Sequence, residues 1–201
     1  MLLKTGPRTA PLTAEERARI FGGHFANMGR LSRAGDLLLA GPFGQTRSDP
    51  TLRGIFVLDT AEPARARELA ESDPGFRAGV FALHYHPLAT AAALRAQRLA
   101  DLAAHDAIVA SGRTPQPGEG GRSYVLLTAT DGEDARGALA HHPAVLLAAR
   151  LDGTRALFLL DAANVAAARE RLGALTGRLG AFTLDEWFGS GLLVELPKRT
   201  D

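Results

Sequence analysis

The sequence contains no cysteine among its 201 residues. This absence excludes disulfide bonds, catalysis by a thiolate, and zinc or iron–sulfur sites built from cysteine ligands. It leaves the cellular compartment open, because chains without cysteine occur in oxidising and reducing surroundings alike. The chemistry therefore has to be sought in other residue types, histidine and aspartate above all.

An excess of one charge is missing as well. The chain has 23 lysines and arginines against 22 aspartates and glutamates, and the arginines are scattered among acidic residues and alanines. Nucleic-acid-binding domains instead gather their basic residues into a patch or stripe. We therefore expect no nucleic-acid partner, while a small-molecule ligand remains compatible with this composition.

Long hydrophobic runs are absent too. The first seven residues, MLLKTGP, are too short in apolar side chains to resemble the core of a signal sequence, and no later stretch approaches the length of a membrane span. The overall hydrophobic content of 46% is ordinary for a folded chain with a buried core. We expect a cytoplasmic protein without membrane association.

What the sequence does contain is an internal repeat. Residues 54–61 (GIFVLDTA) match residues 156–163 (ALFLLDAA), and each segment is followed by an Ala-Arg-Glu triplet at the same distance. Residues 79–83 resemble 180–184, and residues 15–25 resemble 133–143. Chance likeness between alanine- and arginine-rich helices is the alternative, but strands and loop glycines match as well as helices. The chain is thus interpreted as two diverged copies of one unit.

The first copy has the order β-α-β-β-α-β, the ferredoxin-like arrangement. Thr13 followed by Glu16 predicts a capped helix start, and Gly35 predicts its end. The expected strands cover residues 1–5, 37–40, 54–58 and 79–86, and the expected helices begin at residue 13 and cover residues 63–72.

The second copy predicts the same order. Asp152-Gly153 between two apolar runs indicates a hairpin, the strongest short-range strand signal in the chain. The expected strands cover 124–130, 145–151, 155–160 and 181–187, and the expected helices 133–141 and 164–172. The predicted organisation is a first unit over 1–90, a connecting segment over 91–121 and a second unit over 122–201. The connecting segment contains a helix (94–105), and a Pro/Gly-rich stretch (114–122) links it to the second unit.

The fold class is therefore α+β, with two ferredoxin-like units in one chain. A unit of this kind covers only one face of its sheet with helices, so the other face must pack against something. Two tandem copies can cover each other, and we expect them to form an intrachain pseudo-dimer. A further homodimer is left open.

The first copy resembles the YCII-related proteins. The resemblance is carried by four segments that together span most of residues 1–90: GHFAN at 23–27, GDLLLAGP at 35–42, GIFV at 54–57 and ESDPGFRAGV at 71–80. It implies a dimeric α+β barrel built of ferredoxin-like units. It also implies a polar pocket made by the helix histidine and the aspartate of the Asp-Pro motif, here His24 and Asp73. Members of that family have been proposed as enzymes, and the wider superfamily includes a dehydrochlorinase and lactone isomerases.

His24 and Asp73 are accordingly the candidate catalytic residues. A carboxylate beside an imidazole fixes its tautomer and makes it a better base, which suits proton transfer or elimination. Each residue also has a purely structural interpretation. A histidine within a helix is often a hydrogen-bonded packing residue, and an aspartate before proline often caps a turn.

Further candidate ligand-binding residues lie at the end of the segment 35–42 and in the loop that follows it. Gly41 and Pro42 end a strand where a ligand can approach the backbone closely, and the long loop after them carries Asp49 and Arg53. Many relatives have an acidic residue soon after Gly-Pro. This chain has Gly44-Gln45 there, so we expect Asp49 to supply that group or the group to be missing.

His84 and His86 complete the candidate ligand-binding set. Two residues apart on the predicted strand 79–86, they are expected to share one face. No further ligand accompanies them in the sequence, so we expect neither a metal nor another cofactor.

The two copies differ at these positions. Leu175 stands where Asp73 would, Gly41-Pro42 has no counterpart, and Trp187, a packing residue in this interpretation, stands in place of His86. The comparison predicts one pocket per chain, in the first copy. An enzyme that acts on a small cyclic or aromatic molecule is one hypothesis. A ligand-binding or structural module with a vestigial pocket is another, and an oxygenase with a bound haem is a third.

Overall fold

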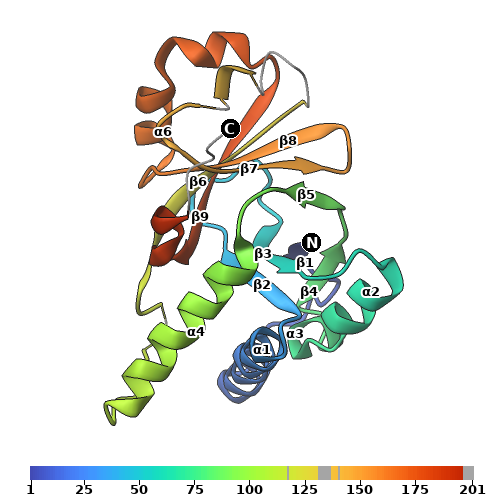
Figure 1. The fold of residues 1–201 in the computed structure, drawn as a ribbon. Helices are drawn as coiled ribbons and strands as arrows, with labels where there is room; N and C mark the ends of the chain where they lie inside the picture. The colour runs from blue at the N-terminus through green and yellow to red at the C-terminus, as the bar shows by residue number, and fades with distance from the viewer. Residues whose placement is uncertain (117, 131–136, 140, 197–201) are drawn as a thin grey trace. The chain divides into compact units, whose positions relative to one another are not determined.

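The computed structural model describes residues 1–116, 118–130, 137–139 and 141–196. It divides the chain into two compact units, the first made of residues 1–41 and 51–85 and the second of residues 42–50 together with 86 onward. Figure 1 traces both units from the blue N-terminal strand to the red C-terminal segment. The predicted boundaries at 90 and 121, and the predicted packing as a pseudo-dimer, stay predictions.

The first unit has the ferredoxin-like order that the sequence predicts. Its four-stranded antiparallel sheet runs β2-β3-β1-β4, so the first strand lies between the third and the fourth. Its elements are β1 (Leu2–Thr5), α1 (Ala14–Ala34), β2 (Leu37–Pro42), β3 (Leu52–Leu58), α2 (Pro63–Glu71), α3 (Pro74–Arg77) and β4 (Phe81–His84).

Helix α1 begins and ends where the sequence predicts. The Thr13 hydroxyl accepts a hydrogen bond from the Glu16 amide, and the Glu16 carboxylate accepts one from the Thr13 amide. Gly35 ends the helix with a φ of 90°, a left-handed conformation that glycine adopts without steric cost. These two caps fix the length of the helix that carries His24.

One face of the first sheet packs against the helices. Its core consists of side chains from all four strands and both long helices: Leu3, Leu31, Leu37, Phe56, Leu69 and Phe81. Along β1, Leu3 pairs with Gly54 and Leu83 on this face, whereas Leu2 pairs with Ile55 and His84 on the opposite one. The register thus assigns each strand residue of the unit to the core face or to the other face.

The second unit repeats this strand order. Its sheet runs β5-β7-β8-β6-β9, so β7-β8-β6-β9 corresponds to β2-β3-β1-β4 and β5 is an added edge strand. Its elements are β5 (Leu88–Thr90), α4 (Leu94–Ala110), β6 (Gly121–Thr130), β7 (Val145–Leu151), β8 (Arg155–Leu160), α6 (Val165–Leu172) and β9 (Phe182–Ser190), with 3-10 helices η1 (Gly173–Arg178) and η2 (Gly191–Glu195). The α+β class with two antiparallel sheets, each accompanied by helices, is confirmed.

The predicted hairpin between β7 and β8 is present. Asp152 and Gly153 have φ angles of 50° and 75°, positive values typical of a tight turn, and three residues separate the paired Leu151 and Arg155. The predicted helix over 133–141 lies mostly outside the described residues; within it, residues 137–139 are helical. The strand predicted over 79–86 is shorter, because β4 ends at His84 and β5 begins four residues later.

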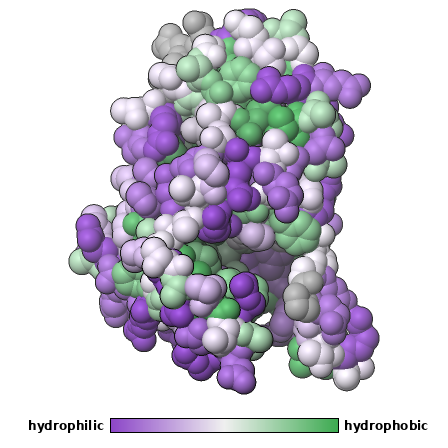
Figure 2. Space-filling view, turned by 180° about the vertical axis from the view of Figure 1, so that it is seen from behind, coloured by the Kyte–Doolittle hydropathy of each residue, from purple (hydrophilic) through white to green (hydrophobic). Residues whose placement is uncertain are grey.

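Among the residues that the structure describes, no helix combines the length and the apolar character needed to cross a membrane. Figure 2 shows one face of the molecule, on which hydrophilic residues predominate and hydrophobic ones form separate small patches.

Candidate functional site

His24 and Asp73 lie in direct contact, although 49 positions separate them in the sequence. Nδ1 of His24, in α1, is 2.6 Å from Oδ2 of Asp73, the residue that precedes α3. Both residues are buried, with exposed fractions of 8% and 1%. The fold therefore brings together the two residues that were predicted to form a polar pocket.

The second oxygen of Asp73 caps the short helix α3. Oδ1 accepts hydrogen bonds from the amides of Gly75, at 2.8 Å, and Phe76, at 3.2 Å. An ionised carboxylate can only accept hydrogen bonds. The proton between Asp73 and His24 therefore belongs to Nδ1, and the neutral imidazole has its lone pair on Nε2. This tautomer follows from the hydrogen-bond pattern.

Two glycines make room for this arrangement. A Cβ at Gly75 would lie 2.6 Å from the Phe81 ring and 2.9 Å from Oδ1 of Asp73, and one at Gly23 would lie 3.0 Å from the Pro74 side chain. Gly23 therefore allows α1 to approach α3 closely, and Gly75 leaves room for the Phe81 ring and the Asp73 carboxylate. Both belong to the segments that carry the family resemblance.

Phenylalanine rings enclose the His24 imidazole. Phe56 stacks on it with an interplanar angle of 15° and 5.7 Å between ring centroids, and the Phe81 centroid lies at 5.3 Å. Phe21 and Phe25 meet it edge-on, at 6.3 and 5.4 Å. Apart from Asp73, the ring contacts of the imidazole are thus apolar.

Nε2 of His24 has no hydrogen-bond partner among the described residues. It is also not among the fully buried polar atoms that lack such a partner. An atom without a partner that is not fully buried is accessible to solvent. The histidine therefore presents its lone pair to the outside while its other nitrogen is fixed in the interior.

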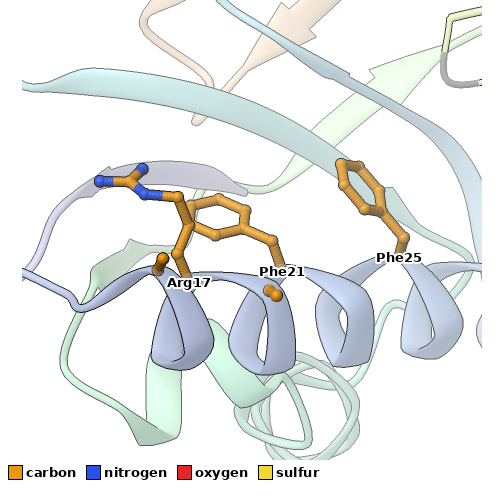
Figure 3. Close-up of a pocket in the computed structure, with 5 residues that line it drawn as sticks. Arg17, Phe21 and Phe25 are labelled. Carbon is orange, nitrogen blue, oxygen red and sulfur yellow. The ribbon is translucent and has the colours of Figure 1, made fainter.

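A shallow groove adjoins this histidine on α1. Its lining consists of Ala14, Arg17, Ala18, Phe21 and Phe25, and its volume is about 450 Å³. Figure 3 shows Arg17, Phe21 and Phe25 projecting from the same side of the helix. Two of the rings that contact His24 therefore also form the groove wall. Phe25 is 57% exposed, which is unusual for so large an apolar ring.

Sequence reasoning missed the groove residues. Helical spacing could have found them, because positions 14, 17, 21 and 24 recur every three or four residues and so lie on one face of α1. Phe56 and Phe81 could not have been assigned to the site in this way, since only strand pairing brings them to His24.

The loop after Gly41 and Pro42 belongs to the second unit rather than to the His24 pocket's own unit. The Gly44 amide donates to the Glu186 carbonyl, the Ser48 amide donates to the Asp185 carboxylate, and Phe43 forms a bridge with Trp187. The loop backbone therefore forms hydrogen bonds and a β-bridge with residues of β9. The predicted ligand-binding role of Gly41 and Pro42 remains a prediction.

The loop's two charged candidates are placed near its end. Asp49 lies within it, and Arg53 lies on β3, where its guanidinium donates to the Leu52 carbonyl. Both make further interactions within the protein. Their predicted ligand-binding role likewise remains a prediction.

His84 and His86 do not share a strand face, so that expectation was wrong. His84 is the last residue of β4, and it lies on the sheet face opposite to the one that carries Phe81 and packs against His24. His86 lies beyond the strand and belongs to the second unit. The physical reason is that the chain leaves the first sheet after His84. Within the described residues, no cluster of three or more histidine or carboxylate side chains has the geometry to hold a metal ion.

His86 has its own charged surroundings. Its Nδ1 lies 3.2 Å from a carboxylate oxygen of Asp152 and 3.2 Å from the Arg155 guanidinium. Burial and then the charge of Arg155 lower the pKa of His86. A guanidinium can only donate and a carboxylate can only accept, so these two contacts require opposite roles of Nδ1, unlike the single contact of His24.

The second unit lacks a corresponding pair among its described residues. Leu175, which the predicted repeat aligns with Asp73, lies in η1, and the His142 side chain accepts a hydrogen bond from the Ala144 amide. Trp187 is 2% exposed and packs beside Tyr124, with 6.0 Å between ring centroids. Among the described residues, a histidine–aspartate pair that connects two helices thus occurs in the first unit.

The comparison with family models also distinguishes the first unit from the second. Residues 1–85 match the model of the YCII-related domain, and the second sheet lies outside the match. No curated protein and no solved structure matches the chain. The His24–Asp73 pair therefore lies in the part of the chain that matches the YCII-related domain.

Proposed function

We propose that the YCII-related domain is a small-molecule enzyme in which His24 acts as a general base. The observation that supports this is the direction of one hydrogen bond. Asp73 accepts the Nδ1 proton, so the lone pair of the neutral imidazole is on the nitrogen that has access to solvent. A structural histidine has no need for an unpaired nitrogen at the surface.

The chemistry follows from this orientation. Nε2 removes a proton from a carbon or oxygen atom of the substrate, and the imidazolium that forms is stabilised by the Asp73 carboxylate at 2.6 Å. The phenylalanine rings keep this charge pair away from bulk water, which strengthens the attraction between its members. Proton abstraction followed by isomerisation, or by departure of a leaving group, is the reaction class that this arrangement suits.

We propose further that residues 122–201 are a degenerate copy of the same unit. The support is the shared strand order, β7-β8-β6-β9 against β2-β3-β1-β4, together with the sequence repeat. The copy has Leu175 in place of Asp73 and so has lost the carboxylate partner. It serves as structure, and the chain has one site.

The competing function is a module without catalysis, in which His24 and Asp73 only join α1 to α3. The burial of the pair and the capping role of Asp73 favour it. A variant that keeps the contact between α1 and α3 but removes the base distinguishes the enzyme from the structural module. In His24→Asn the amide nitrogen occupies the position of Nδ1 and can still donate to Asp73, but the side chain has no counterpart of Nε2.

The test uses 5-nitrobenzisoxazole, an aromatic compound whose ring opens when a base removes its C3 proton. The electron pair of that C–H bond forms the nitrile as the N–O bond breaks, and the product is a coloured cyanophenolate. A positioned general base accelerates such a step by about 10²–10⁴-fold. We expect the wild-type protein to exceed buffer by a factor in this range.

The matched control is His105→Ala, which removes an exposed histidine of α4. We expect His24→Asn to react no faster than buffer while folding like the wild type, and His105→Ala to retain the full rate. Equal rates in His24→Asn and wild type would refute the proposal and leave the structural module.

A further inference from the structure

The groove beside His24 indicates what kind of substrate the site takes. We propose that the ligand is a small aromatic or alicyclic carboxylate, with its ring against Phe21 and Phe25 and its anionic group on Arg17. This inference rests on the proposed function of His24, because it identifies the substrate class of the same site.

The apolar part of the argument comes from Phe25. A ring that is 57% exposed, beside alanines at positions 14 and 18, is apolar surface that a hydrophobic ligand can cover. Phe25 also contacts the His24 ring edge-on, as does Phe21, the second ring of the groove. A planar ring laid on these two side chains therefore covers the two groove residues that contact the His24 ring.

The charge comes from Arg17. Its guanidinium makes no hydrogen bond or ion pair with the described residues, whereas nearby Arg8 is paired with Glu16. Arg17 is the one charged residue of the groove lining among the residues that the structure describes. An apolar wall with an unpaired cation at one end complements a ligand that is apolar with an anion at one end, and guanidinium groups bind carboxylates in a two-pronged geometry.

The spacing limits the size of the ligand. Arg17 and His24 lie seven residues apart on one face of α1, or about 10 Å between Cα atoms. Part of that distance is covered by the long arginine side chain. A single ring with a carboxylate on a short carbon chain fills the remainder, whereas a compound without a ring leaves Phe25 uncovered.

The test compares 3-phenylpropionate with 3-phenylpropionamide, which has the same ring and chain but no charge. Binding is followed by NMR through the side-chain signals of Arg17, Phe25 and His24. We expect the carboxylate to shift these signals and to bind more tightly than the amide. In Arg17→Gln the carboxylate should lose about fivefold in affinity, the ratio that one exposed ion pair supplies, while the amide is unaffected.

Arg33→Gln is the matched control, since it removes a cation from the last turn of the same helix, outside the groove. Equal binding of acid and amide, equal losses in the two glutamine variants, or shifts confined to other parts of the protein would overturn the inference. The readout does not depend on catalysis. Carboxylate binding without elimination by His24 would therefore overturn the proposed function alone, and elimination without carboxylate binding would overturn this inference alone.

Discussion

Asp73→Asn is the substitution that tests the central feature of the site, the direction of the hydrogen bond to His24. The change replaces a carboxylate by an amide of nearly the same shape. Oδ1 of the asparagine must still accept from the amides of Gly75 and Phe76, because those two donors point at it from α3. The amide NH₂ is then the group that faces Nδ1 of His24.

This replacement should reverse the tautomer of the imidazole. Since the NH₂ group can only donate, Nδ1 must accept, and the proton of the neutral ring moves to Nε2. The nitrogen with access to solvent then carries a hydrogen and has no lone pair for a substrate. A change of this kind in the aspartate of the serine protease triad lowers kcat by about 10⁴-fold, and we expect a loss of comparable order here.

The cost in stability should be small by comparison. Asparagine caps helices about as well as aspartate, so the start of α3 is retained. What changes is one hydrogen bond, from a charge-assisted one to a neutral one, and the difference between the two kinds is about 1 kcal/mol. Asp73→Ala, in contrast, removes the cap and leaves Nδ1 of His24 buried without a partner, which should cost about 2–4 kcal/mol.

Two measurements check this prediction. Long-range ¹H–¹⁵N correlation spectra of the imidazole should show the proton on Nδ1 in the wild type and on Nε2 in Asp73→Asn. The ring-opening rate of 5-nitrobenzisoxazole should fall to the buffer rate in the same variant and stay unchanged in Asp106→Asn, on the exposed side of α4. A wild-type spectrum with the proton on Nε2 would refute the reasoning about both the tautomer and the base.

Three further predictions concern the framework of the two units. Gly75→Ala should destabilise the first unit by about 1–3 kcal/mol in chemical denaturation, because its Cβ would press on Phe81 and Asp73, whereas Gly29→Ala, with open space around it, should be neutral or stabilising by up to about 1 kcal/mol. Thr13→Ala should cost about 1 kcal/mol through loss of the α1 cap; an unchanged unfolding midpoint would contradict the cap's contribution. In the second unit, burial raises the pKa of Asp101, although Ser190 and Gln97 donate to it. A raised pKa in the folded state means that the carboxyl's contribution to stability is complete below the unfolded value of 3.8 and is lost as the pH rises through the folded value. Asp101→Asn should therefore gain melting temperature over the wild type as the pH is raised from about 4 to 7, and a pH-independent difference would contradict it.

The sequence predicted most of the fold because local signals agreed with one another. Thr13 and Glu16 set the start of α1, Gly35 set its end, and Asp152-Gly153 set the hairpin, each through backbone geometry that few other residues satisfy. The repeat then extended these assignments from one half of the chain to the other. The end of β4 was misplaced because the apolar alternation continues past His84, and nothing local marks the point where the chain leaves the first sheet.

The site was predictable only in part, for a related reason. The resemblance pointed to His24 and Asp73, but a resemblance says nothing about which nitrogen faces the carboxylate. The enclosure by Phe56 and Phe81 depends on the pairing of β3 and of β4 with β1, which no periodicity within one element encodes. Arg17 and Phe25 lay within reach of helical-wheel reasoning, and were missed because the motif drew attention to polar residues.

The hydrogen-bond pattern changes how the two interpretations of Asp73 relate to each other. Capping and catalysis were alternatives at the level of sequence, since one carboxylate seemed to serve one purpose. In the structure the two carboxylate oxygens have separate roles, because Oδ1 accepts from the amides of α3 and Oδ2 accepts from His24. The first contact fixes the position of the carboxylate, and so it also fixes how Oδ2 meets the imidazole. The cap is thus a condition for the proposed base, and stability and the proposed proton transfer should be separable only by a substitution such as Asp73→Asn that preserves one contact and inverts the other.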